Sequence, residues 1–479
     1  MSQLRTDEIV DADGNGAPDF PNGLTSQGTI KLDGNYPVGT GNVALGDTAL
    51  SSVEAGGNYN VAIGSAAGDA ITSGDSNIGI GLNALGTTIT GAENIAIGTN
   101  AMLANSSGSS NVGIGTYALN SNTASNNTAV GYQALTANQT GTRNVAIGLL
   151  SFGKQVNTND STGVGYLAGR YMTGSGNTAI GSYTLGAGSS GGNSGSHNTA
   201  VGYQALEDMT NGTENTGVGS LSLNNVESGS GNTAVGRESL LNLTTGSQNT
   251  AVGKLALVTS NGNNNVAMGQ EALRLNGSGS DNVAIGFESS YIGTSVSSGV
   301  AVGYQAGYNT TGDANTFLGF EAGKTVTSGT NSVAVGKGAL KGGSTTGDFN
   351  VAIGRTAMSS MTSGTQNHAL GVDSMAGNQT GSYNVALGAS ALRLGTAVTQ
   401  NTVVGNQSGR QLTSNNNTFI GMESGYYITS GANNTILGRH NGNQGGLDIR
   451  TSSNNIVLSD GNGNPRCYWD ANGMLNQVT

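Results

Sequence analysis

The residues best suited to acid–base chemistry are glutamates that recur at one place in a sequence repeat: Glu238, Glu271, Glu288, Glu321 and Glu423. Glu271 and Glu288 lie one repeat apart, so stacking of successive repeats at strand spacing would bring their carboxylates to about 5 Å. That separation is typical of the two carboxylates of a retaining glycosidase. Two solvated carboxylates at a turn fit the same pattern, because water screens like charges from each other. We expect no catalytic residue, and a polysaccharide-degrading enzyme is an alternative.

Two segments have the alternating acid and amide spacing that begins a calcium loop: Asp11-x-Asp13-x-Asn15-Gly16 and Asp460-x-Asn462-x-Asn464. In the first segment, Asn22 stands where the loop needs its bidentate glutamate. The second segment lies within a predicted hairpin, where a turn explains the same spacing. We predict that the chain binds no metal ion and needs no cofactor.

Tyrosine, often beside glutamine, follows the glycine of the repeat: Tyr132, Tyr166, Tyr203 and Tyr304, with Gln133, Gln204 and Gln305. Outward tyrosine and glutamine suit contact with sugars or proteins, through a flat ring and an amide that donates and accepts. A surface ladder that stabilises neighbouring repeats is the alternative interpretation. His368 stands at a strand position and only 3 histidines exist, so no Ser/His/Asp arrangement is indicated.

Composition argues against several classes of function. The net charge of −11 and the absence of a basic cluster argue against binding of nucleic acid. Cys467 is the single cysteine, so no disulfide within the chain supports the fold, which fits a reducing cytosol. The first residues lack the apolar run of a secretory signal. No stretch approaches the roughly 20 apolar residues of a membrane helix, and we expect no membrane insertion.

These residues belong to a repeat whose centre is the phrase Asn-Val-Ala-Ile-Gly, as at Asn60–Gly64, Asn144–Gly148 and Asn350–Gly354. About 25 copies follow one another between residues 42 and 459, nearly all at intervals of 16 or 17 residues. Period-two alternation, abundant glycine and the lack of a 3.6-residue stripe predict strands and no helix. The predicted fold is all-β: a parallel β-solenoid of about 25 rungs with stacked ladders of asparagine.

Each position of the repeat predicts a place in the rung, counting the asparagine as position one. Positions two and four carry Val, Ile, Leu or Thr and are expected to fill the interior. Position three, mostly Ala or Gly, is expected on the opposite face, where a second chain approaches through residues such as Ala146 and Ala251. Position five is glycine at a sharp exit, and position nine, as at Leu135, turns inward. Such a thin core favours association of chains.

The repeat divides the chain into three parts: residues 1–40, 41–445 and 446–479. Residues 1–40 lack the repeat and are interpreted as an attachment or capping module. Residues 446–479 contain the last rung and two apolar runs joined by Asp-Gly and Asn-Gly, which predict a β-hairpin. This hairpin carries Tyr468 and the only tryptophan, Trp469, and is expected to cap the open end of the stack.

The phrase Asn-Thr-Ala-Val-Gly-Tyr-Gln-Ala-Leu, at Asn127–Leu135 and Asn198–Leu206, resembles the head repeat of trimeric autotransporter adhesins. The resemblance covers residues from about 42 to 458 and implies a left-handed β-roll in which three chains form a homotrimer. The sequence shows no stalk or membrane barrel like those of that family. The same head repeat occurs in bacteriophage tail fibres, and the segments Met1–Gly23 and Asn455–Arg466 resemble the start and the close of such fibres.

The resemblance implies a non-enzymatic virion fibre, of a phage tail or capsid, that takes part in attachment to a host surface. Its expected partners are further copies of the chain, a virion protein at the N-terminal end, and a glycan or protein of the host surface. The fibre would be made in the host cytoplasm and located in the virion. The alternative is the head of a bacterial trimeric surface adhesin, located at the cell surface. No binding residue is assigned.

Overall fold

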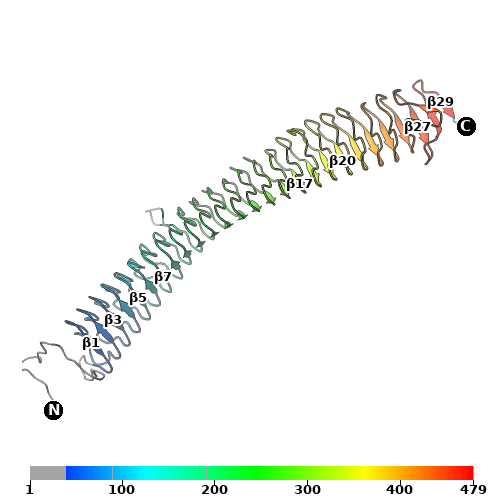
Figure 1. The fold of residues 1–479 in the computed structure, drawn as a ribbon. Coiled ribbons are helices and arrows are strands. Elements are labelled where there is room, and N and C mark those ends of the chain that lie inside the picture. The colour runs from blue at the N-terminus through cyan, green and yellow to red at the C-terminus, as the bar shows by residue number, and fades with distance from the viewer. Residues whose placement is uncertain (1–38, 89, 187, 189–192, 478–479) are drawn as a thin grey trace, which may run out of the picture.

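The chain winds into a long, gently curved rod of short strands and turns (Figure 1). The computed structural model describes residues 39–88, 90–186, 188 and 193–477. No helix occurs in these ranges, which confirms the predicted all-β class. The segment 1–38, with the calcium-like residues from Asp11 to Asn22, lies outside the described residues. The interpretation of residues 1–40 as an attachment module therefore stays a prediction.

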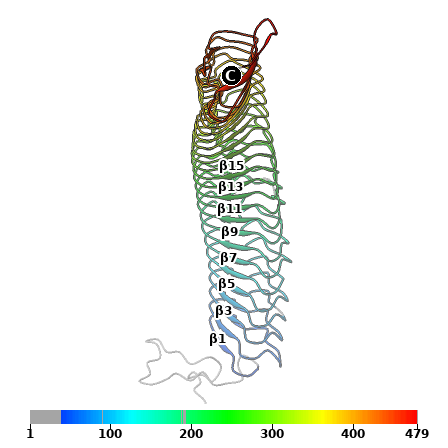
Figure 2. The same cartoon turned by 90° about the vertical axis from the view of Figure 1, so that its right-hand side faces the viewer.

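Most strands are three residues long, and they stack along one side of the rod (Figure 2). The strands are β1 (Val43–Leu45), β2 (Val61–Ile63), β3 (Ile78–Ile80), β4 (Ile95–Ile97), β5 (Val112–Ile114), β6 (Thr128–Val130), β7 (Val145–Ile147), β8 (Thr162–Val164), β9 (Thr178–Ile180), β10 (Thr199–Val201), β11 (Thr216–Val218), β12 (Thr233–Val235), β13 (Thr250–Val252), β14 (Val266–Met268), β15 (Val283–Ile285), β16 (Val300–Val302), β17 (Thr316–Leu318), β18 (Val333–Val335), β19 (Val351–Ile353), β20 (His368–Leu370), β21 (Val385–Leu387), β22 (Thr402–Val404), β23 (Thr418–Ile420), β24 (Thr435–Leu437), β25 (Asn443–Gln444), β26 (Leu447–Asp448), β27 (Ile456–Ser459), β28 (Pro465–Trp469) and β29 (Leu475–Gln477).

The sheet confirms the predicted stacking of repeats. It contains 27 strands, of which β1 to β24 and β27 pair in parallel, each with the strand of the next rung. The register aligns identical positions, so Ala62 lies beside Ala44 on one side and Gly79 on the other. The fold is therefore a parallel β-solenoid. The left-handed sense implied by the resemblance stays a prediction.

The prediction of which strand side chains fill the interior was wrong. Position three faces the core: Ala96, Ala146 and Ala251 are fully buried. Positions two and four face outward, as Val145 and Ile147 do on either side of Ala146. The physical reason is a narrow cross-section, since the strand stands so close to the opposite wall of its rung that a methyl group fills the space. Ala146 and Ala251 therefore belong to the chain's own core and offer no surface to a second chain.

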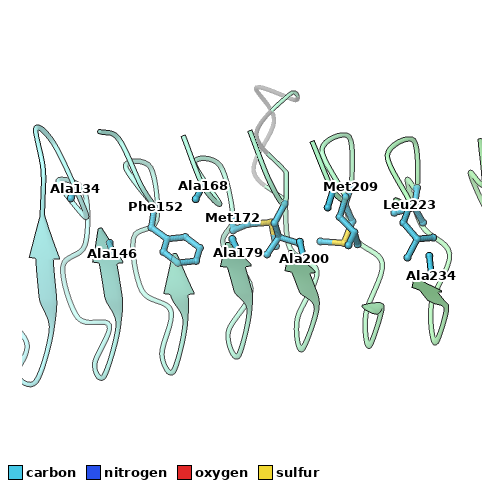
Figure 3. Packing of buried hydrophobic residues seen from close by; sticks show 14 of the residues in the cluster. Ala134, Ala146, Phe152, Ala168, Met172, Ala179, Ala200, Met209, Leu223 and Ala234 are labelled. Atoms are coloured by element: carbon cyan, nitrogen blue, oxygen red, sulfur yellow. The ribbon is translucent and has the colours of Figure 1, made fainter. Parts of the chain in front are cut away.

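The opposite wall of the core comes from positions eight, nine and twelve of each rung. The inward direction of position nine is confirmed, because Leu135, Leu206 and Leu392 are fully buried. Position twelve was not recognised in the sequence, since it varies between apolar residues such as Met172 and polar ones such as Asn138. Figure 3 shows side chains of this wall meeting the strand alanines across the rung.

Position five needs glycine for two reasons. Its φ lies near +130°, as at Gly148, which is a conformation that residues with a Cβ rarely adopt. A Cβ at Gly148 would also lie 2.3 Å from the carbonyl oxygen of Gly165 on the next rung. The predicted glycine exit is confirmed. Further left-handed corners, which the sequence did not reveal, lie at positions seven and nine, as at Gln133 (φ 55°) and Leu135 (φ 49°).

A ladder of buried asparagines at position one runs along the stack, as predicted. The side-chain amide of Asn94 donates to Oδ1 of Asn77 at 3.0 Å and to the carbonyl oxygen of Gly108 at 2.8 Å. Oδ1 of Asn77 also accepts the backbone N–H of Asn94 at 3.0 Å. Because each amide both donates and accepts, the ladder satisfies polar groups that would otherwise be costly to bury.

Antiparallel strands close the C-terminal end. β28 pairs with β27, which places Tyr468 opposite Val457 and Trp469 opposite Ile456. The predicted hairpin is confirmed, whereas β29, which pairs with β28, was not predicted. Tyr468 packs against the end of the core, while Trp469 and Ile456 line one hollow on the outward side. Of the two aromatic residues, Tyr468 is the one that closes the stack.

Candidate functional site

A continuous feature of the described surface is the outward side of the strands, here called the apolar face. It carries half-exposed apolar side chains at position four, and Val, Ile or Thr at nearly every position two. At position four, Leu318 is 48% exposed and Leu370 is 51% exposed. Other exposed position-four side chains are Leu45, Ile63, Ile147, Ile180, Val235, Met268, Ile285, Leu387, Ile420 and Leu437. The in-register pairing aligns these side chains along the rod, from β1 to β27. A contiguous exposed apolar surface of this kind is a candidate for contact with another molecule.

Position six forms a second row, beside the apolar face, and carries aromatic side chains on some rungs and polar or aliphatic ones on others. Tyr304 is stacked between Phe287 and Phe320, with ring centroids 5.4 and 5.0 Å away. Lys337 covers the outer side of Phe320, with its ammonium 5.4 Å from the ring centroid. The flat faces of these rings are thus occupied by one another. This arrangement supports the interpretation of the row as a ladder that stabilises neighbouring rungs.

The remaining predicted tyrosines are exposed in the same row. Tyr166 and Tyr203 both meet Tyr183 edge-on, at centroid distances of 5.2 and 6.3 Å. Tyr132 is 47% exposed. Contacts between rings on neighbouring rungs therefore support the ladder interpretation for Tyr166 and Tyr203. For Tyr132, the choice between ligand binding and stacking stays a prediction.

Each glutamate predicted at position seven is engaged by a neighbouring side chain. The partners are Arg237 for Glu238, Arg274 for Glu271, Gln305 for Glu288, Lys324 and Lys341 for Glu321, and Arg439 for Glu423. Oε2 of Glu271 accepts from Arg274 at 3.1 Å, and Oε2 of Glu288 accepts from Gln305 at 2.6 Å. The pKa of the Glu321 carboxyl is lowered, mainly by the hydrogen bond from Lys324. A general acid needs a raised pKa. These glutamates link neighbouring residues and rungs.

The second calcium-like segment is a turn in the structure. Oδ1 of Asp460 accepts the backbone N–H groups of Asn462 at 3.0 Å and Asn464 at 2.9 Å, and Oδ2 binds Arg466. Within the described ranges, no group of three or more His, Cys, Asp or Glu side chains is placed to hold a metal ion. His368, at position two of β20, is exposed on the apolar face.

Fold and surface together define the chain as a rod-like parallel β-solenoid with an apolar face along its length. No protein-family model, curated protein or solved structure matches the chain. In the part of the chain that the structure describes, no helix has the length and apolar character to cross a membrane.

Proposed function

We propose that the chain is a non-enzymatic structural subunit of a virion fibre that takes part in host attachment, and that it assembles as a homotrimer through its apolar face. The observation that supports assembly is the row of exposed position-four side chains along the sheet. A partner can cover such a row at every step only if it has the same rise per rung and a similar length. A further copy of this chain meets both conditions. The number three comes from the resemblance to trimeric adhesin heads and phage tail fibres.

Association in parallel explains why β-branched residues recur on an outward face. Ile147 and Ile285 are 41% and 38% exposed in the single chain. Removal of apolar surface from water is favourable by about 25 cal/mol for each Å², before the entropic costs of association are subtracted. Because the same contribution recurs at each rung, many small contacts add up along the rod. The assembly thus compensates for a core whose strand side holds mainly alanine.

The virion assignment rests on the shape of the rod and on its two ends. β1 and β29 lie at opposite ends, so one end can hold a particle while the other meets a host surface (Figure 1). The N-terminal segment resembles the start of phage fibres, and at the other end Tyr468 closes the stack. We therefore assign the N-terminal segment to the virion and the C-terminal hairpin to the host side.

Deletion of residues 1–35 tests this assignment. The truncated chain should keep its circular dichroism spectrum and its oligomeric mass, and should be missing from purified particles. Full-length chain with the same affinity tag is the control and should be incorporated. Incorporation of the truncated chain would contradict the orientation, and failure of the full-length chain to enter any particle would contradict the virion assignment.

A further inference from the structure

An insertion reshapes the surface of the rod close to its C-terminal end. The step from Asn434 to Asn455 is 21 residues, longer than the usual 16 or 17, and it contains the antiparallel pair of β25 and β26. Both ends of the insertion are hydrogen-bonded to the preceding rung. The N–H of Tyr427 donates to the carbonyl oxygen of Asn441 at 2.8 Å, and the N–H of Thr429 to that of Arg450 at 3.0 Å. The insertion is therefore held firmly beside Tyr427.

Two hollows border Tyr427 at this insertion. The first has a volume of about 170 Å³ and is lined by Gln407, Glu423, Tyr426, Tyr427 and Asn441. The second has a volume of about 210 Å³ and is lined by Gln411, Tyr427, Thr429, Arg450 and Thr451. Tyr427 borders both hollows and is 45% exposed. The lining residues belong to loop positions of their rungs, outside strands β22 to β24 and hence outside the apolar face.

Neighbouring side chains fix the ring of Tyr427. The rings of Tyr426 and Tyr427 meet edge to face, with centroids 4.6 Å apart and planes at 74°. Tyr426 is itself held by Arg410, whose guanidinium lies 5.4 Å from the ring centroid and donates to the phenol oxygen. A half-exposed ring fixed in this way loses little conformational freedom when a ligand binds, which favours affinity.

Amide groups with unused hydrogen-bonding capacity surround the ring. Within the described residues, the side-chain amides of Gln407 and Gln411 have no hydrogen-bond partner. Oδ1 of Asn441 accepts the N–H of Asn443 at 3.0 Å, while its Nδ2 has no partner there. An amide offers two donors and an acceptor, which matches a hydroxyl group that does both. Such groups beside an aromatic ring suit a ligand rich in hydroxyl groups.

Two of the three arginines at the site, Arg439 and Arg450, form ion pairs with carboxylates. Arg439 binds Glu423 at 2.7 Å, and Arg450 binds Asp448 at 2.7 Å. Hydrogen bonding from Arg450 lowers the pKa of Asp448 to about 2, so this pair stays ionised at neutral pH. The guanidinium of Arg410 has no carboxylate partner and is engaged by the ring and phenol oxygen of Tyr426. Each of the three guanidinium groups thus already contacts a carboxylate or a tyrosine, so none is left unengaged to bind an anion. A neutral ligand therefore fits better than an acidic one.

We propose that this site binds a neutral oligosaccharide. Tyr427 stacks against one sugar ring, and the amides of Gln407 and Gln411 form hydrogen bonds with hydroxyl groups in the two flanking hollows. The inference deepens the proposed function, since the site lies toward the end assigned to the host surface. Only the source of the glycan, a host surface, rests on the proposed function. Binding of the oligosaccharide itself needs nothing but the folded chain.

An array of neutral and acidic glycans, probed with the full-length protein, tests the proposal. Wild-type protein should retain neutral glycans, and Tyr427→Ala should weaken their binding at least tenfold. Tyr427→Phe keeps the ring and should retain most of the binding. Tyr383→Ala is the matched control, because Tyr383 is another exposed tyrosine, 58% accessible, on a different rung. This control should bind like the wild type.

Three results would overturn the proposal: retention of no glycan, retention of acidic glycans alone, or equal binding by wild type and Tyr427→Ala. Circular dichroism of each variant should match that of the wild type, which excludes misfolding as the cause of lost binding. Failure here leaves the fibre proposal standing, because oligomeric mass and incorporation into particles are measured without any glycan. Conversely, a protein that binds glycans but enters no particle would contradict only the virion assignment.

Discussion

Phe152 occupies the space that a side chain at Gly169 would fill: a Cβ on Gly169 would lie 2.1 Å from Cε1 of the ring. Gly163, on the same adjoining rung, would bring a Cβ within 2.6 Å of Cε2. The ring reaches from its own rung toward the next one (Figure 3). The aromatic ring of Phe152 thus fits at position nine only because the adjoining rung has glycine at positions three and nine.

Phe317 shows the same relationship from the strand side of the core. It stands at position three, where most rungs have alanine, and it lies between Gly307 and Gly323. A Cβ on these glycines would lie 2.8 and 2.4 Å from the ring. Gly307 belongs to the preceding rung, whereas Gly323 belongs to the same rung as Phe317. Core volume is therefore shared both within a rung and between successive rungs.

A double-mutant cycle at Phe152 and Gly169 tests this sharing of volume. Phe152→Ala should destabilise the surrounding rungs by about 3–5 kcal/mol, because it leaves a cavity. Gly169→Ala should destabilise them by about 1–3 kcal/mol through overpacking. In the double variant the new methyl group enters the cavity, so the loss should be smaller than the sum. Hydrogen exchange of the amides of β7 to β9 measures the local stability, and additive losses would contradict the shared volume.

The asparagine ladder yields a second prediction, at Asn94. Asn94→Asp removes the amide that donates to Asn77 and Gly108 and places a carboxylate beside their oxygen atoms. One oxygen of the new carboxylate can still accept from Asn111, as Oδ1 of Asn94 does, whereas the second oxygen faces acceptors. We expect a loss of about 2–4 kcal/mol in local stability at neutral pH, because a buried charge that is only partly hydrogen-bonded is costly. Asn94→Ser is the matched control, since Ser161 occupies position one naturally and its Oγ accepts the N–H of Asn177 at 3.4 Å. Equal losses for the two variants would rule out the role of charge.

A third prediction concerns assembly through the apolar face. Ile147→Glu combined with Ile285→Glu places charges on the face while leaving the core intact. Sedimentation should then show a folded monomer of 47.5 kDa in place of a trimer. Leu394→Glu is the control, because Leu394 is 48% exposed but lies in a loop outside the strands, and the trimer should persist. A wild-type protein that sediments as a folded monomer would overturn the proposed assembly.

Because position three faces the core, Ala146→Arg should act on the fold of the chain itself. If Ala146 and Ala251 lay on a face that meets a second chain, as the sequence alone predicts, arginine at both positions would block association there. Because Ala146 is fully buried, an arginine there should disrupt the core of β7 and its neighbours. Loss of circular dichroism together with loss of association would distinguish this outcome from that of the glutamate variants on the apolar face.

A fourth prediction is a loss of stability at acidic pH near the C-terminal end. His440 is fully buried, and burial lowers its pKa below the ordinary value of 6.5. Its Nδ1 lies 3.3 Å from the carbonyl oxygen of Gly463. The neutral ring thus stabilises the fold fully above pH 6.5, and this contribution is lost as the pH falls from there through the lower pKa of the folded state.

Hydrogen exchange of β27 and β28, compared at pH 8 and pH 5 after correction for intrinsic rates, measures the effect. His440→Gln should flatten the dependence on pH, because glutamine does not titrate. His368→Gln is the control, since His368 is exposed on β20, and it should leave the dependence unchanged. An equally steep dependence in His440→Gln would show that another group is responsible.

Much of the fold followed from the sequence because the repeat is local and regular. The spacing of Asn60, Asn77 and Asn94 sets the length of the rung, and the glycine after each strand sets the turn. Identical positions can satisfy one another only when rungs stack in register, so the parallel sheet and the asparagine ladder were predictable. The hairpin at residues 456–469 was likewise encoded in local turn residues.

By itself the sequence determined the period, the strands and their register, but it did not determine which strand face encloses the core. Alternation distinguishes two faces, whereas the inner one is decided by the width of the rung, set by distant side chains such as Leu135 and Met172. With that wall close to the strand, alanine fits inside and isoleucine is left outside. The hollows beside Tyr427 likewise exist only because an insertion folds back onto the preceding rung. Both the inward strand face and the hollows depend on contacts between segments that are distant in the sequence, and local sequence patterns do not reveal such contacts.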